Sequence, residues 1–126
     1  MKIDAKSPPR SYRCGTRQQI EIKDCGRVMA DADEQLTFVT PNGGEYDLAR
    51  KSWGFYATPS INGRLASFGF RTVLVKNKIG QFFVMLVERG YEDDFQAYLA
   101  DENLTVVTWF DDKSLDRLSK LFDQAG

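Results

Sequence analysis

The stretch of sequence that decides the fold is Phe70–Glu88, which reads FRTVLVKNKIGQFFVMLVE. Two strand-like runs, Phe70–Lys76 and Gln81–Glu88, flank the four-residue segment Asn77–Gly80, and this pattern predicts a β-hairpin. The second run is apolar at every position from 82 to 87, so we expect a central strand that is covered on both faces. The side chains predicted to be almost fully buried here are Val75, Val84 and Leu86.

The segments after this hairpin predict a helix, a strand and a second helix. Glu92–Leu99 starts with three acidic residues, which are favourable at the N-terminal end of a helix. Leu104–Phe110 is rich in β-branched and aromatic residues, as strands are. Asp111 or Asp112 is suited to cap a last helix. The apolar residues of that helix expected to face inward are Leu115, Leu118, Leu121 and Phe122.

The segments before the hairpin predict further strands. Gln35–Thr40 and Glu45–Arg50 flank the turn sequence Pro41–Gly44 and should pair across it. Two shorter strands, Gln19–Lys23 and Arg27–Ala30, are expected on either side of a turn at residues 24–26. The side chains expected to share the buried face of the longer pair are Leu36, Phe38, Tyr46 and Leu48.

A short helix is expected between these strands and the hairpin. Thr58 is suited to its N-cap and Pro59 to its first position, while Gly69 is suited to its C-terminal end. The residues at helical spacing that should form its buried stripe are Ile61, Leu65 and Phe68. Because Asn62 and Gly63 are poor helix formers, we expect the helix to be short or irregular.

These patterns predict an α+β protein with a mostly antiparallel sheet, two or three short helices and a C-terminal half of order β-β-α-β-α. The length of 126 residues fits one domain that folds without a disulfide or a metal. Residues 1–12 contain Ser7-Pro8-Pro9 and show no periodicity, so we expect a flexible tail. Residues 13–126 are then a single α+β domain.

The composition excludes several kinds of chemistry. The chain has no histidine, which removes Ser-His-Asp and Cys-His catalytic sites and His-ligated metals. Its two cysteines, Cys14 and Cys25, are too few for a four-thiolate zinc site, so we expect free, buried thiols, no metal and no cofactor. Glu45 and Asp47 would lie on one strand face roughly 6–7 Å apart, a separation that two-carboxylate chemistry can use. Carboxylates of this kind are more often surface groups.

The charge of the chain is divided unevenly. Residues 1–80 carry 13 Lys and Arg against 8 Asp and Glu, whereas residues 81–126 carry 4 against 10, giving +5 and −6. Phe68-Gly69-Phe70 resembles the core of an RNA-recognition strand but lacks its flanking residues, and we expect no nucleic-acid partner. The N-terminus has no apolar h-region and the longest apolar run is six residues, so we expect no membrane insertion and a cytoplasmic location.

The richest mixture of aromatic, glycine and polar residues lies at positions 51–70. Sugars stack on exposed aromatic rings, and arginines bind phosphates, so residues 51–71 are a candidate surface for a small anionic or sugar-like ligand or for a partner protein. The core is the competing interpretation for its aromatics. The candidate ligand-binding residues are Lys51, Trp53, Tyr56, Asn62, Arg64 and Arg71.

One geometric hypothesis concerns Arg64. Its guanidinium is expected to reach solvent while its stem packs on Tyr56 or Trp53, and the alternative is a surface ion pair with Glu45 or Asp47. We expect a non-catalytic binding or accessory protein. The alternatives are a histidine-free enzyme that uses Tyr46 or the two carboxylates on a nucleotide-sugar, and a protein-interaction module of the immunity or regulatory type.

The segments Trp53–Leu65 and Phe68–Asn77 resemble small uncharacterised proteins encoded beside bacterial surface-polysaccharide biosynthesis genes. This resemblance covers residues 13–110. It implies a role near glycan or nucleotide-sugar assembly, and it implies neither a reaction nor a catalytic residue.

Overall fold

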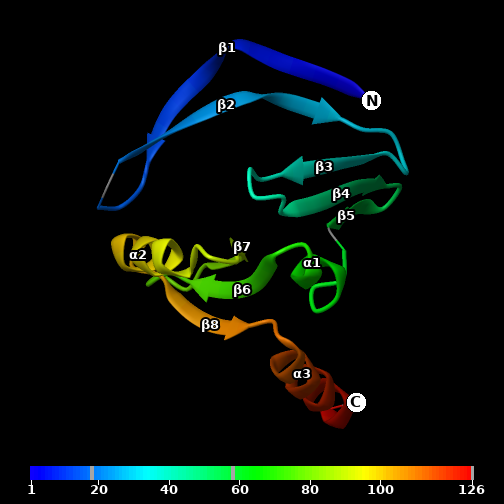
Figure 1. Cartoon of the computed structure of the whole chain (residues 1–126), viewed down its shortest axis with the longest axis vertical. Coiled ribbons are helices and arrows are strands. Elements are labelled where there is room, and N and C mark those ends of the chain that lie inside the picture. The colour runs from blue at the N-terminus through cyan, green and yellow to red at the C-terminus, as the bar shows by residue number, and fades with distance from the viewer. Residues whose placement is uncertain (18, 58, 126) are drawn as a thin grey trace.

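A computed structural model describes residues 1–17, 19–57 and 59–125 of the chain. It shows an α+β protein whose strands all pair antiparallel, in three small sheets of order β1-β2, β3-β4-β5 and β7-β6-β8 (Figure 1). The elements are β1 (Lys2–Cys14), β2 (Ile20–Met29), β3 (Gln35–Val39), β4 (Glu45–Lys51), β5 (Gly54–Ala57), α1 (Arg64–Ser67), β6 (Phe70–Lys76), β7 (Phe82–Glu88), α2 (Glu92–Glu102), β8 (Thr105–Trp109) and α3 (Asp112–Ala125). No helix in these described ranges has the length and apolar character needed to cross a membrane.

The core of the molecule lies in the β7-β6-β8 sheet, as the hairpin sequence predicts. β6 and β7 pair from Phe70 opposite Glu88 to Lys76 opposite Phe82, and the intervening loop is closed by the Asn77 side chain. One face of the sheet packs against α2. The buried side chains of this cluster are Val73, Val75, Val87 and Leu99. The predicted order β-β-α-β-α of the C-terminal half is therefore confirmed.

The position of β7 in the sheet differs from the prediction. β7 is an edge strand and β6 is central, because β8 pairs with the other side of β6. Val75 is fully buried as expected, but Leu86 is only half-buried and Val84 is 65% exposed. The continuous apolar run of β7 therefore lies at the rim of the sheet.

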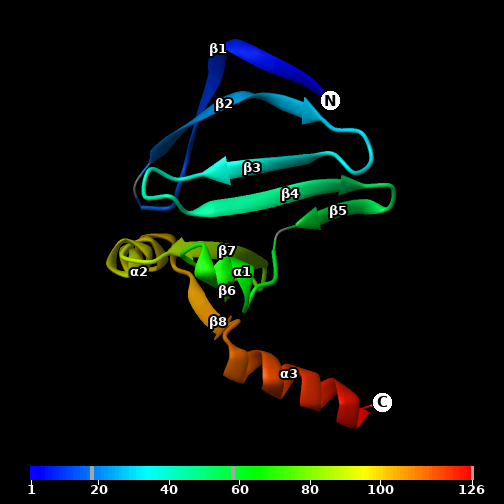
Figure 2. The ribbon, with the colours of Figure 1, turned by 45° about the vertical axis from the view of Figure 1, so that its right-hand side comes forward.

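The N-terminal residues form an arm instead of the expected flexible tail. β1 pairs with β2 from Lys2 opposite Met29 to Cys14 opposite Ile20, so residues 20–29 are one strand and not two strands with a turn. We call residues 2–29 the arm. It arches over β3 in both ribbon views (Figures 1 and 2).

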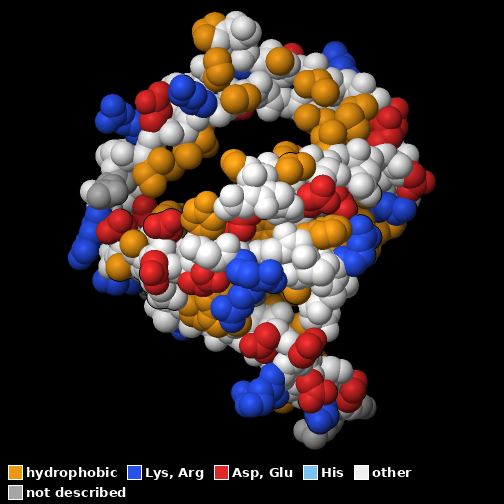
Figure 3. Space-filling view, viewed as in Figure 1, with side chains coloured by type: hydrophobic (Ala, Val, Ile, Leu, Met, Phe, Trp, Pro, Cys, Tyr) orange, Lys and Arg blue, Asp and Glu red, His pale blue; other side chains and the backbone are white. Residues whose placement is uncertain are grey.

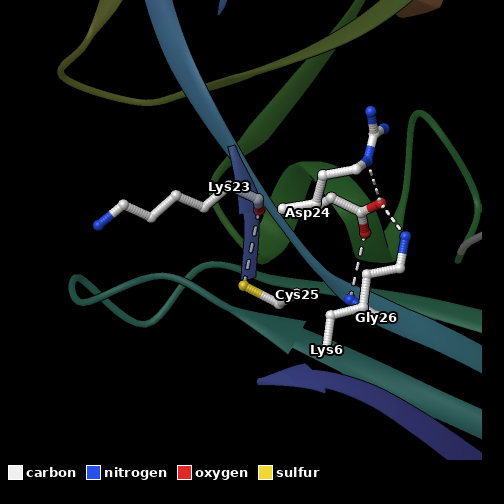
Figure 4. Close-up of polar contacts among 6 residues, drawn as sticks. Lys6, Lys23, Asp24, Cys25 and Gly26 are labelled. Carbon is white, nitrogen blue, oxygen red and sulfur yellow. Dashed lines mark hydrogen bonds and ion pairs between the residues drawn. The ribbon is translucent and has the colours of Figure 1, made fainter. Parts of the chain in front are cut away.

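Asp24 stabilises the arm where the register of β1 shifts between Ala5 and Arg10. Its carboxylate lies 2.7 Å from Lys6 Nζ and 3.5 Å from Arg10 Nε, and it accepts a 3.2 Å hydrogen bond from the Gly26 N–H (Figure 4). The hydrogen bond from Lys6 and that from Gly26 lower the pKa of Asp24 below its ordinary value of 3.8.

The helix expected after Pro59 is reduced to one turn, α1, which starts at Arg64. Its expected N-cap, Thr58, lies outside the described residues, and the Ser60 hydroxyl instead accepts the Arg64 N–H at 3.0 Å. Leu65 is fully buried, as predicted, and Gly69 follows the helix with φ of +97°, the left-handed conformation that favours glycine.

The last helix, α3, projects from the body of the molecule (Figures 1 and 2). Asp111 caps it as predicted, since its Oδ1 accepts the Ser114 N–H at 2.9 Å. Of the four α3 residues predicted to face inward, only two are partly buried. Leu115 and Leu118 are partly buried, but Leu121 and Phe122 are 60% and 70% exposed because the C-terminal end of α3 extends away from the sheets.

Candidate functional site

The six predicted ligand-binding residues do not surround one cavity. Three belong to the β4–β5 hairpin, two to α1 and the segment that leads into it, and one to β6. They divide between two separate hollows and the tip of the hairpin. In chain order they are Lys51, Trp53, Tyr56, Asn62, Arg64 and Arg71.

The first hollow, of about 230 Å³, contains Tyr56 and Arg64. Arg64 Nη2 lies 3.8 Å from Asp47 Oδ2, which is the surface ion pair that we considered as the alternative. The guanidinium also lies 5.3 Å from the centre of the Phe68 ring, a cation–π contact with an aromatic other than the expected Tyr56 or Trp53. Arg64 is exposed but already paired.

The second hollow, of about 140 Å³, contains Asn62 and Arg71 beside the N-terminus of α3. Asn62 Nδ2 donates a 2.8 Å hydrogen bond to Asp112 Oδ1. The Arg71 guanidinium lies 4.1 Å from the centre of the Trp109 ring, a cation–π contact. Both predicted ligand donors therefore have partners from the C-terminal part of the chain.

Two polar groups of the second hollow bear on its chemistry. The Ser114 N–H and hydroxyl lower the pKa of Asp111, and the charge of Arg71 lowers it further. Asp111 is therefore held ionised as a helix cap, which does not suit a general acid. The Thr72 hydroxyl is buried and, among the residues with a described position, has no hydrogen-bond partner.

The tip of the β4–β5 hairpin presents large aromatic side chains. Trp53, Phe55 and Tyr56 are 70%, 58% and 55% exposed. Strand alternation directs Phe55 and Tyr56 to opposite faces of the hairpin, with Trp53 in the turn. Beside the turn, Lys51 Nζ pairs with Asp33 Oδ1 at 2.6 Å. These three aromatics are thus surface groups, whereas Phe70 at the end of the same stretch belongs to the core.

The paired carboxylates of β4 are on one strand face, as expected from the strand period. Asp47 accepts a 2.7 Å hydrogen bond from the Thr37 hydroxyl and faces Arg64. Glu45 lies opposite Val39 in the register. Asp47 is therefore committed to contacts within the fold.

Likeness to other proteins does not identify the site. Comparisons of the chain with protein-family models, with curated protein sequences and with solved structures find no match. Its function must therefore be inferred from the geometry of its surface.

Both thiols are free, as predicted, but both are exposed where we expected burial. The reason is that Cys14 and Cys25 lie on the arm, outside the core that the β7-β6-β8 sheet forms with α2. Across the parts of the chain that the structure describes, no three Cys, Asp or Glu side chains gather as metal ligands.

The residues that contact the candidate residues could not be predicted from the sequence. Asp33, Asp112 and Trp109 lie 18, 50 and 38 positions from the residues that they contact. None of these separations is a helix or strand period, so local patterns carry no signal for them. The high aromatic content of residues 53–56 is the one sequence signal that indicated a surface feature.

Proposed function

We propose that this protein is a non-catalytic binding module that docks a partner protein through the tip of its β4–β5 hairpin. The exposure of Trp53, Phe55 and Tyr56 within four consecutive positions carries the proposal. Tryptophan and tyrosine dominate the energetics of protein interfaces, and exposed clusters of large apolar side chains mark interaction sites. Because these rings project on both faces of the hairpin, the matching surface is an apolar groove that receives the tip.

The contacts that the basic residues make within the chain favour a protein partner over a small anion. Lys51 and Arg64 pair with Asp33 and Asp47, and Arg71 is stacked on Trp109. A phosphate would have to displace these contacts before it bound. The role near glycan assembly stays a prediction from the resemblance, and the identity of the partner tests it.

The experiment compares affinity capture by the tagged wild-type chain with capture by Trp53→Ala and Tyr56→Ala. Ile79→Ala is the matched control, since Ile79 is 80% exposed at the tip of the neighbouring β6–β7 hairpin. We expect one protein to be retained by the wild type and by Ile79→Ala and lost from both hairpin variants. Equal capture by all four chains, or by none, contradicts the proposal.

A calorimetric titration tests the small-ligand alternative directly. Inorganic phosphate and a uridine diphosphate sugar are titrated into the wild type and into Arg64→Ala. We expect no measurable heat of binding for either chain. Saturable binding that Arg64→Ala abolishes would replace the proposed partner protein with an anionic ligand.

A further inference from the structure

The chain exposes far more surface than a compact protein of its size. Its accessible surface is 9258 Å², whereas a compact monomer of 14.3 kDa is expected to expose roughly 6,800 Å². The excess of roughly 2,500 Å² is several times the about 800 Å² that each partner buries in an interface of standard size. It fits an obligate homodimer, in which each chain buries about 1,000–2,500 Å².

Part of this excess is an apolar face on the arm. The β1–β2 register places Ile3 opposite Val28 and Tyr12 opposite Ile22, and Ile20 shares their face. These five side chains are 37% to 65% exposed. The opposite face carries charged residues such as Glu21 and Lys23, while Asp24 and its partner Arg10 interrupt the apolar face between Ile22 and Val28.

The apolar face of the arm faces the β3-β4-β5 sheet. Val28 lines a cavity of about 90 Å³ together with Leu36, Phe38 and Leu48. Beyond this point the arm and the sheet separate, and Figure 3 shows an opening between them with hydrophobic side chains along its border. The five apolar residues of this face of the arm, together with Phe38, are called the open apolar face. The five residues are Ile3, Tyr12, Ile20, Ile22 and Val28.

The element suited to cover this face is α3, but not the α3 of the same chain. α3 is amphipathic, and Leu121 and Phe122 on its apolar stripe are exposed. It lies at the opposite end of the molecule from the arm (Figures 1 and 2). Of the other described helices, α1 has four residues and α2 is packed on β7 through the core.

We infer that two copies of this chain pair by packing α3 of each copy on the open apolar face of the other. The 14 residues of α3 span about 21 Å, which fits along the roughly 33 Å of β2. α3 carries three Asp against three Lys and Arg, so it is not repelled by the arm, where residues 1–29 carry 7 Lys and Arg against 3 Asp and Glu. Each copy both provides an α3 and receives the α3 of the other copy. This arrangement has two-fold symmetry and therefore forms a closed dimer.

The pairing uses α3 and the open apolar face, which adjoins Phe55 of the β4–β5 hairpin in one cavity but includes neither Trp53 nor Tyr56. It therefore does not depend on the proposed function, whose tests change Trp53 and Tyr56. Its first test is the molar mass of the full chain in solution by light scattering after size exclusion. We expect a dimer for the wild type and a monomer for the double variant Leu121→Asp, Phe122→Asp. Phe82→Asp, which alters an exposed ring on β7, should remain dimeric. Circular dichroism shows whether each variant is folded.

The native cysteines identify the face that is covered. Cys14 lies opposite Ile20 and so shares the open apolar face, whereas Cys25 alternates onto the charged face. We expect iodoacetamide to modify Cys25 at least tenfold faster than Cys14 in the wild type, and both at similar rates in the Leu121→Asp, Phe122→Asp variant. Mass spectrometry separates the two tryptic peptides.

Three results would overturn the inference. The first is a wild-type chain that stays monomeric at 100 μM, roughly the concentration at which weak pairs still associate. The second is a folded double variant that remains dimeric. The third is a dimer in which Cys14 reacts as fast as Cys25, since the arm would then be uncovered.

Discussion

Leu65 and Val84 show how far the burial of a single side chain can differ from the burial that the local sequence predicts. Leu65 belongs to a helix of four residues and is fully buried, whereas Val84 lies in the most apolar run of the chain and is largely exposed. Burial depends on what packs over a side chain. Leu65 belongs to α1, which packs against β6, while Val84 lies on the edge strand of its sheet.

Leu65→Ala should therefore lower the free energy of unfolding by about 2–5 kcal/mol, because it removes a buried side chain and leaves a cavity. Val84→Ala should change it by less than about 0.5 kcal/mol, as exposed substitutions do. Urea denaturation at equal protein concentration measures both. A larger loss for Val84→Ala than for Leu65→Ala would show that β7 is covered in solution.

Asp24 gives the arm a dependence on pH. Its lowered pKa means that the ionised form is stabilised in the folded arm relative to the unfolded chain. The stabilisation is complete above the ordinary value of 3.8 and is lost as the pH falls through the lower folded value.

We expect the carbon-13 resonance of the Asp24 carboxyl to titrate below pH 3.8 in the wild type and at higher pH in Lys6→Gln. Lys23→Gln is the control, because the Lys23 side chain points away from Asp24 (Figure 4). An unchanged titration in Lys6→Gln would rule out the Lys6 contact as the main cause of the shift.

Among the elements, the turn between β3 and β4 joins two sheets. Gly44 is buried, and a Cβ at this position would lie 2.8 Å from Phe70 Cε2 and 2.8 Å from Thr40 Oγ1. The Thr40 hydroxyl also hydrogen-bonds Glu88 at the end of β7. The absence of a side chain at Gly44 thus allows the β3–β4 hairpin to approach the core sheet.

Gly44→Ala should destabilise the fold by about 1–3 kcal/mol, the usual cost of overpacking. Ser67→Ala is the control, since Ser67 lines the same surface hollow as Gly44 but is exposed, and its substitution should have a smaller effect. Thermal denaturation compares the two variants. Equal losses would mean that the approach at Gly44 is not tight.

The order of the strands in the core sheet differs from the prediction, which placed β7 in the centre. An apolar run on both faces is typical of a covered strand, and local pattern cannot say where the next strand will pair. The α2 crossover carries the chain past β6, so that β8 pairs with the far side of β6 and leaves β7 at the edge.

At the scale of the whole molecule, the buried apolar side chains of the described residues lie between positions 65 and 99. The core cluster Val73, Val75, Val87 and Leu99 belongs to this part, whereas none of the described apolar side chains of the arm is buried. Local opening is easiest where few apolar contacts must be broken.

Amide hydrogen exchange should therefore be slowest in β6, which is paired on both sides, and at least tenfold faster in β2 of the monomeric Leu121→Asp, Phe122→Asp variant. In the wild-type dimer the protection of β2 should rise. Equal protection of β2 and β6 in the monomeric variant would show that the arm is stable on its own.

The sequence by itself determined the α+β class, the β6–β7 hairpin, the turn at residues 41–44, the order of the C-terminal elements and the cap at Asp111. These features depend on side-chain periodicity and turn chemistry over a few residues, which local sequence contains. Only the tertiary structure decided that residues 2–12 form part of an arm, that β7 is an edge strand, and that Lys51, Arg64 and Arg71 are paired within the chain. The physical reason is that pairing and burial arise between segments far apart in sequence, and the free energy of each contact depends on which surface the folded chain brings to it.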